Sequence, residues 1–96
     1  MAKYKLSPRA QRQMGDIWRN IAVHNEPAAD RLLQKLFDKF ELVATHPEMG
    51  PARPDISPAA RLVIEGRYIA IYEPTIYGAE IVVIVHGMRE PSTWFD

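Results

Sequence analysis

Apolar residues recur at intervals of three and four along the first part of the chain. The stripe begins just after Ser7 and Pro8, residue types that suit a helix N-cap and the first helical position. It consists of Ala10, Met14, Ile17, Trp18, Ile21 and Ala22, and the positions between them are mostly polar, namely Arg9, Arg12, Gln13, Asp16, Arg19 and Asn20. This spacing predicts an amphipathic helix that ends near residue 22, with Trp18 packed in the core.

A second helix is predicted after the sequence Asn25-Glu26-Pro27, which interrupts the first pattern. Its apolar side is formed by Ala29, Leu32, Leu33, Leu36, Phe37, Phe40 and Val43. Because the connection is only a few residues long, the two helices should form an antiparallel hairpin. The apolar side that they share requires a sheet to cover it.

Four segments have the composition of β-strands, at residues 3–6, 61–65, 67–73 and 79–88. Gly66 separates the second from the third, and residues 74–78 form the turn before the fourth. Residues 46–60 contain Pro47, Gly50, Pro51, Pro54 and Pro58, which predicts an irregular loop. The order βααβββ predicts an α+β fold with a single domain over residues 1–96, in which an antiparallel sheet packs against an α-helical hairpin.

The last predicted strand is apolar on both sides. With regular alternation, Ile81, Val83 and Val85 lie on one side and Val82, Ile84 and His86 on the other. Such a strand requires cover above and below. In the preceding strand, Ile69 and Ile71 suit the side under the helices, and Tyr68 and Tyr72 suit a half-wet surface that meets another chain.

One helical hairpin covers only one side of a sheet. We therefore predict an apolar groove on the other side, filled by an external amphipathic helix or by a strand added at the sheet edge. The alternative is that the proline-containing loop, together with Trp94 and Phe95, folds back and closes this side.

Composition narrows the classes of function. Twelve basic and twelve acidic residues give a net charge of +0, which argues against nucleic acid as the main partner, because phosphate neutralisation requires a basic excess. The absence of cysteine excludes disulfides and thiol chemistry. His24 and His46 have no spacing suited to a metal, so we expect no metal and no cofactor. We expect a cytoplasmic protein, since no apolar run is long enough to span a bilayer.

Five segments together resemble the ParE-type toxins of the RelE/ParE toxin-antitoxin superfamily. They are LSPRA (6–10), IWRNIAVHNEPAAD (17–30), THPEMGPARPD (45–55), EGRYIAIYEP (65–74) and EIVVIVHGMRE (80–90), and they cover nearly the whole chain in order. The resemblance implies the βααβββ fold. It also implies a toxin of a type II system, neutralised by a ParD-like antitoxin, that either poisons DNA gyrase, as ParE-type members do, or cuts messenger RNA, as RelE-type members do.

The residues at the C-terminus favour the gyrase branch. The arginine that the ribonucleases carry after the last strand is matched by Arg89, but Phe95 stands where they carry a proton-transferring tyrosine. Their lysine pair is also unmatched, since this region offers Arg53 and Arg61. We therefore expect a non-enzymatic toxin with no catalytic residues.

The residues that we expect to bind partners are Arg67, Tyr68, Tyr72, Val82, Ile84, His86, Arg89 and Trp94. For Arg67 and His86, a solvated strand end and local packing are the simpler alternatives. A second hypothesis is a metal-independent mRNA endonuclease that uses Arg61, His86 and Arg89. A third is an inactive relative that only assembles with its antitoxin to regulate transcription.

Overall fold

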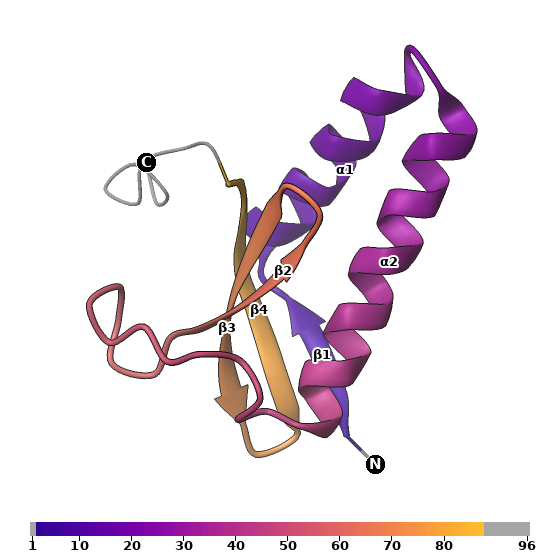
Figure 1. Cartoon of the computed structure of the whole chain (residues 1–96). Coiled ribbons are helices and arrows are strands. Elements are labelled where there is room, and N and C mark those ends of the chain that lie inside the picture. Colours follow the sequence, from indigo (N-terminus) through magenta and orange to yellow (C-terminus); the bar gives the residue numbers. More distant parts are fainter. Residues whose placement is uncertain (1, 88–96) are drawn as a thin grey trace.

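The predicted order of elements is confirmed. A computed structural model describes residues 2–87. It contains β1 (Lys3–Leu6), α1 (Pro8–Ala22), α2 (Glu26–Thr45), β2 (Arg61–Glu65), β3 (Tyr68–Thr75) and β4 (Gly78–His86). The strands form one sheet in the order β1-β4-β3-β2, and the two helices lie together on one side of it (Figure 1).

Both helices begin at the residues that the sequence indicates. The Ser7 hydroxyl accepts a hydrogen bond from the Ala10 amide, and the Asn25 side chain accepts one from the Ala28 amide, so each helix has an N-cap. The expectation that Trp18 belongs to the core is wrong. It is only partly buried, and its indole N–H donates to Asp30 over 2.8 Å, which joins α1 to α2. Within residues 2–87 neither helix is long and apolar enough to cross a membrane.

The sheet is mixed. β2, β3 and β4 pair antiparallel as predicted, whereas β1 pairs with β4 in parallel. Gly78 permits this approach, because a Cβ atom there would lie 2.1 Å from the Lys3 carbonyl oxygen. Its φ of 144° is also one that other residues rarely adopt.

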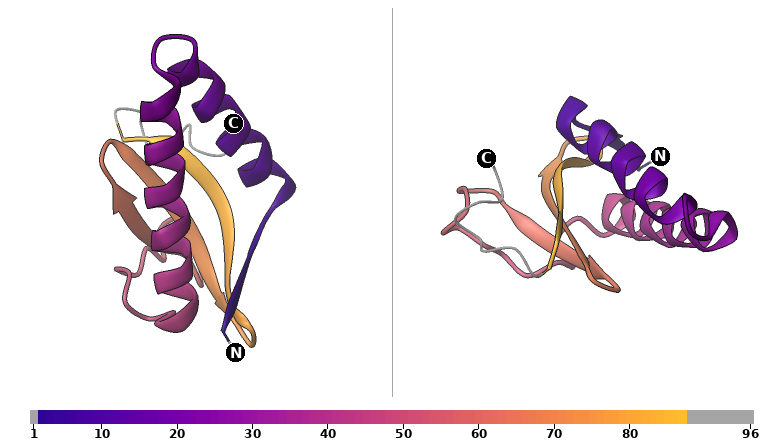
Figure 2. Two further views of the ribbon diagram at one scale, coloured as in Figure 1. Left: turned by 90° about the vertical axis from the view of Figure 1, so that its right-hand side faces the viewer. Right: turned by 90° about the horizontal axis from the view of Figure 1, so that it is seen from above.

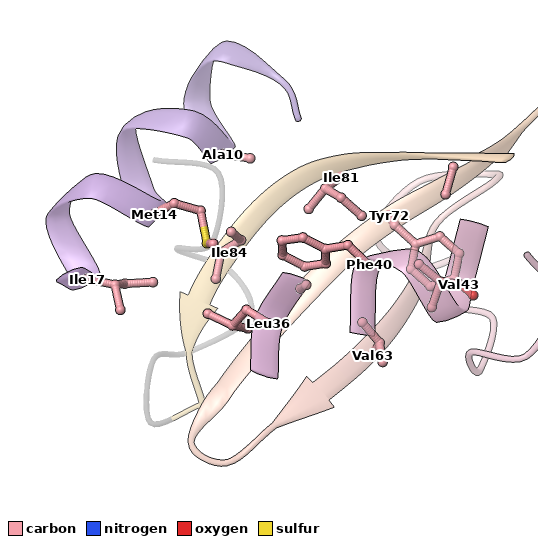
Figure 3. Packing of buried hydrophobic residues seen from close by; sticks show 12 residues of the cluster. Ala10, Met14, Ile17, Leu36, Phe40, Val43, Val63, Tyr72, Ile81 and Ile84 are labelled. Carbon is pink, nitrogen blue, oxygen red and sulfur yellow. The ribbon is translucent and has the colours of Figure 1, made fainter. Parts of the chain in front are cut away.

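The main core lies between the helices and the sheet. Met14 of α1 and Phe40 of α2 meet Ile84 and Ile81 of β4 there, as Figure 3 shows. The other buried members of this cluster are Ala10, Ile17, Leu36, Val43, Val63, Ala70, Tyr72 and Ala79. This packing fixes the position of α1 against β4.

A β-bulge in β4 changes which side chains face the helices. Tyr72 pairs with Ile81 and Ile71 pairs with Val83, so Val82 is the extra residue. As a result Ile81 belongs to the cluster under the helices, while Val83 and Val85 belong to a cluster on the opposite side of the sheet. The prediction that Ile81, Val83 and Val85 share one side is therefore wrong.

The sides predicted for β3 are also reversed. Tyr68 and Tyr72 face the helices, and Ile69 and Ile71 face away from them. Tyr72 is fully buried, at 0% exposure, because its hydroxyl finds hydrogen-bond partners at the rim of the core. Tyr72 thus has no surface to offer a partner in this structure, contrary to our expectation.

The second side of the sheet is not bare. The loop of residues 46–60 crosses on the side opposite the helices (Figure 2). Ile56 and Ala60 of this loop pack with Ile71 and Val83, which are 1% and 0% exposed. The predicted open groove is therefore wrong at these residues, and the alternative, closure by the loop, is what the structure shows. Trp94 and Phe95, the other half of that alternative, lie outside the described residues.

Candidate partner-binding site

A pocket of about 390 Å³ lies between α1 and the end of β4. From α1 it is lined by Gln13, Asp16, Ile17 and Asn20, and from the sheet by Tyr68, Ile84, Val85 and His86. Three of the residues expected to bind partners, Tyr68, Ile84 and His86, thus converge on one hollow. Polar and apolar groups share its lining, which is the usual character of a binding site for another chain.

The pocket exists because two neighbouring strands differ in length. β1 has 4 residues and β4 has 9, and their pairing ends at Leu6 and Ile81. Beyond Ile81, the edge of β4 has no neighbouring strand among the described residues. It faces the first half of α1 instead.

Side chains from the start of α1 take the place of the missing strand. The Ser7 hydroxyl donates to the Val82 carbonyl oxygen over 2.6 Å. The Ile84 amide donates to the Gln13 side-chain oxygen over 2.7 Å. These two bonds satisfy backbone groups that a β-strand would otherwise pair, and they hold α1 against the edge of β4.

The wall of the pocket contains an aromatic pair and one member of an ion pair. The rings of Tyr68 and His86 meet edge to face with centroids 5.4 Å apart, which fixes both at the end of the sheet. Asp16 accepts a hydrogen bond from Arg19 one turn further along α1. Both side chains of that pair are mostly exposed, so a partner can reach them.

The remaining predicted residues have different surroundings. Arg67 is exposed in the turn between β2 and β3, and its carbonyl accepts from the Gly87 amide, next to the end of β4. Val82 is partly buried at the bulge beside Ser7. Arg89 and Trp94 lie outside the described residues.

Arg61, one of the three residues in the ribonuclease hypothesis, serves the fold. Its guanidinium donates to the carbonyl oxygens of Glu48 and Gly50, over 3.0 and 2.7 Å. These bonds hold the loop of residues 46–60 at the start of β2.

Arg61 and His86 do not share a site. Arg61 pairs with Tyr72 and His86 pairs with Tyr68, four residues apart on β3. Strand geometry therefore separates them by about 13 Å along the sheet and about 10 Å across it. This separates the backbone positions of the two residues, and the Arg61 guanidinium is in addition held by the carbonyl oxygens of Glu48 and Gly50. Within residues 2–87, no three histidine or acidic side chains lie close enough to hold a metal ion.

The sequence did not indicate the parts that α1 contributes. Gln13, Asp16 and Asn20 were placed only on its solvated side, and Ser7 only as an N-cap. The length difference between the first and last predicted strands is the signal that could have pointed to an unpaired edge there.

The fold just described, a helical hairpin over a mixed sheet, is shared with a solved toxin-antitoxin structure. The chromosomal ParDE system from P. aeruginosa contains a chain that superposes with a TM-score of 0.72. The two chains are 18% identical, and the match covers 90% of this chain and 96% of that one. A search among curated proteins found no match.

A family model described as the ParE toxin of the type II toxin-antitoxin system parDE matches residues 4–91. The chain therefore belongs to the ParE toxin family.

Proposed function

We propose that this chain is the toxin of a type II pair and that a ParD-like antitoxin neutralises it at the pocket between α1 and β4. The observation that carries this proposal is the end of β4, where side chains of α1 substitute for a strand and a mixed polar and apolar hollow remains. A bound antitoxin segment packs against the partly exposed rings of Tyr68 and His86, above the buried Ile17 and Ile84, and makes hydrogen bonds with polar side chains such as Asn20. Membership of the ParE family supports a ParD-like partner.

We further propose that the toxin inhibits DNA gyrase by binding and carries out no chemistry of its own. Three facts support a binder over a ribonuclease: the net charge of +0, the engagement of Arg61 by the loop, and its separation from His86. Phe95, which replaces the tyrosine of the ribonucleases, has no proton to transfer.

The target is tested with purified components. The toxin is added to a gyrase supercoiling assay and, in parallel, to a cell-free translation assay with a defined messenger RNA. We expect inhibition of supercoiling and intact RNA. RNA cleavage that is lost in His86→Ala, with gyrase unaffected, would establish the ribonuclease instead. Inactivity in both assays, together with antitoxin-dependent operator binding, would indicate the purely regulatory relative.

The antitoxin site is tested with Asn20→Arg, which adds bulk and charge at the pocket without touching the core, since Asn20 is exposed. We expect the dissociation constant for the antitoxin to rise at least about tenfold, which is the effect of disrupting an interface residue that contributes strongly to binding. Gln34→Arg, a comparable change at an exposed position of α2, is the matched control. Equal affinities of both variants and the unmodified chain would place the antitoxin elsewhere.

A further inference from the structure

Asp16 gives the pocket between α1 and β4 a negative charge. Its side chain belongs to a stripe of α1 that faces the pocket and whose members are three and four positions apart, namely Gln13, Asp16, Ile17 and Asn20. Among the described residues that line the pocket, none is a lysine or an arginine. The wall of the pocket therefore has a carboxylate and no strongly basic side chain to balance it.

The carboxylate of Asp16 is only partly engaged within the chain. Its Oδ1 atom accepts a hydrogen bond from the Arg19 guanidinium, and its Oδ2 atom accepts none from any residue of the range 2–87. Both side chains are 64% exposed, and an ion pair so exposed adds little to stability, because water screens it. Arg19 does not line the pocket, since its guanidinium lies back along the helix beside Gly15. Asp16 can therefore accept a second cation from the pocket side.

A partner that covers the pocket has to compensate this carboxylate. Covering removes water from Asp16, and a carboxylate that loses water without gaining hydrogen bonds is strongly unfavourable. A charged donor compensates it better than a neutral one. The pocket also contains the ring of Tyr68, held edge to face against His86. A guanidinium binds a carboxylate through two parallel hydrogen bonds and also stacks on aromatic rings, so arginine suits this lining better than lysine.

We infer that the pocket binds an arginine side chain of the antitoxin, whose guanidinium pairs with Asp16 and lies against the ring of Tyr68. The aliphatic part of that arginine covers Ile17 and Ile84, which are 9% and 3% exposed at the base of the pocket. The inference rests on the proposed function, because it requires the antitoxin at this pocket. Arg19 then competes with the antitoxin for Asp16.

The pairing is tested by changing both partners. Each arginine of the purified antitoxin is replaced by glutamine in turn, and calorimetric titration gives its dissociation constant with the unmodified toxin and with Asp16→Asn. We expect Asp16→Asn to raise the dissociation constant about tenfold. One antitoxin arginine should have a similar effect, and the two changes together should raise it no further. Lysine in place of that arginine should retain only part of the affinity.

Asp38→Asn is the matched control, because Asp38 is an exposed carboxylate of α2 that bonds to Gln34 on the same helix. It should leave the affinity unchanged. Effects that add for every antitoxin arginine would overturn the inference. If Asn20→Arg weakens binding and Asp16→Asn does not, the antitoxin occupies the pocket without an arginine at Asp16. If neither variant weakens binding, the proposed site itself is wrong.

Arg19→Gln gives a test of opposite sign. It removes the cation that competes for Asp16, so we expect the dissociation constant for the antitoxin to fall about two- to fivefold, the range for an exposed ion pair. In Asp16→Asn the same change should have no effect, because no carboxylate remains to compete for. A rise in the dissociation constant with Arg19→Gln would show that Arg19 supports binding and would overturn the inference. Thermal melts of each variant check that the fold is intact.

Discussion

The two ends of the sheet use their polar side chains differently. At the end where β2 begins, the polar side chains bond to the loop of residues 46–60. The Tyr72 hydroxyl accepts a hydrogen bond from the Gly50 amide and donates one to the Pro47 carbonyl oxygen. The Arg61 guanidinium donates to the carbonyl oxygens of Glu48 and Gly50. At the other end, Tyr68, His86 and three polar residues of α1 surround an open pocket. The first end stabilises the fold, and the second is the site at which we propose that a partner binds. Substitutions at the two ends should therefore separate stability from binding.

Gly50→Ala should have the largest effect on the free energy of unfolding. A Cβ atom at this position would lie 2.3 Å from the Leu62 carbonyl oxygen and 2.7 Å from the Tyr72 hydroxyl, so the loop must move. We expect a loss of about 3 kcal/mol in a urea titration, the upper part of the range for overpacking. Gly15→Ala in α1 is the control. There the Cβ atom meets only the flexible end of Arg19, and helix propensity predicts a gain of about 0.5 to 1 kcal/mol. Losses of equal size would contradict this account of the loop.

Tyr72→Phe should cost about 2 kcal/mol, because the Gly50 amide and the Pro47 carbonyl lose a buried partner while the ring remains. The affinity for the antitoxin should not change, since Tyr72 is fully buried and far from the pocket. The measurements are a urea titration and a binding isotherm. If the variant is as stable as the unmodified chain but binds the antitoxin poorly, Tyr72 contacts the antitoxin and the assignment to the core is wrong.

The same hydroxyl predicts a sensitivity to alkali. Burial raises the pKa of Tyr72 above its ordinary value of 10.0, although the hydrogen bond from Gly50 acts the other way. Above pH 10 the unfolded chain therefore loses this proton more readily than the folded chain. The stability that the buried phenol contributes is full below pH 10 and declines as the pH rises toward the folded pKa, by at most about 1.4 kcal/mol per pH unit. Thermal melts between pH 9 and 11 should show a smaller decline in Tyr72→Phe.

His86→Ala should have the smallest effect on stability, about 0.5 kcal/mol, because His86 is only half-buried at the end of β4. The same change removes the ring that contacts Tyr68 at the pocket and should weaken antitoxin binding about tenfold. Calorimetric titration with the antitoxin measures this. A large loss of stability with unchanged affinity would mean that His86 is structural, like Tyr72.

Periodicity was enough to predict the elements and their order. The N-caps at Ser7 and Asn25 and the bounds of β2 follow from local capping and turn residues, whose effects act over a few positions. The parallel pairing of β1 was not predicted, because strand order depends on contacts between residues that are distant in the sequence. For the same reason the sequence did not decide whether the loop covers the side of the sheet opposite the helices, as Ile56 and Ala60 do in the structure.

The sides of the sheet were predicted less well because alternation assumes a regular ladder. One extra residue, Val82, gives Ile81 and Val83 opposite sides, and nothing in a run of five aliphatic residues reveals it. Tyr72 was predicted at the surface because its hydroxyl needs hydrogen-bond partners. In the structure the Gly50 amide and the Pro47 carbonyl supply these partners, so the side chain can be buried. Three residues of the candidate site, Tyr68, Ile84 and His86, were predicted from the sequence. Gln13 was not, because its hydrogen bond with Ile84 joins residues 71 positions apart.

The bonds from Ser7 and Gln13 to β4 also bear on how the chain avoids misfolding. A strand with aliphatic side chains at successive positions can shift its register by one residue and still bury apolar side chains. Hydrophobic burial alone therefore does not disfavour the shifted register. The hydroxyl of Ser7 and the amide of Gln13 recognise particular backbone groups, at Val82 and Ile84, and a shifted strand would leave both unmatched. The start of α1 thus stabilises one register of β4 among several that bury nearly the same apolar surface.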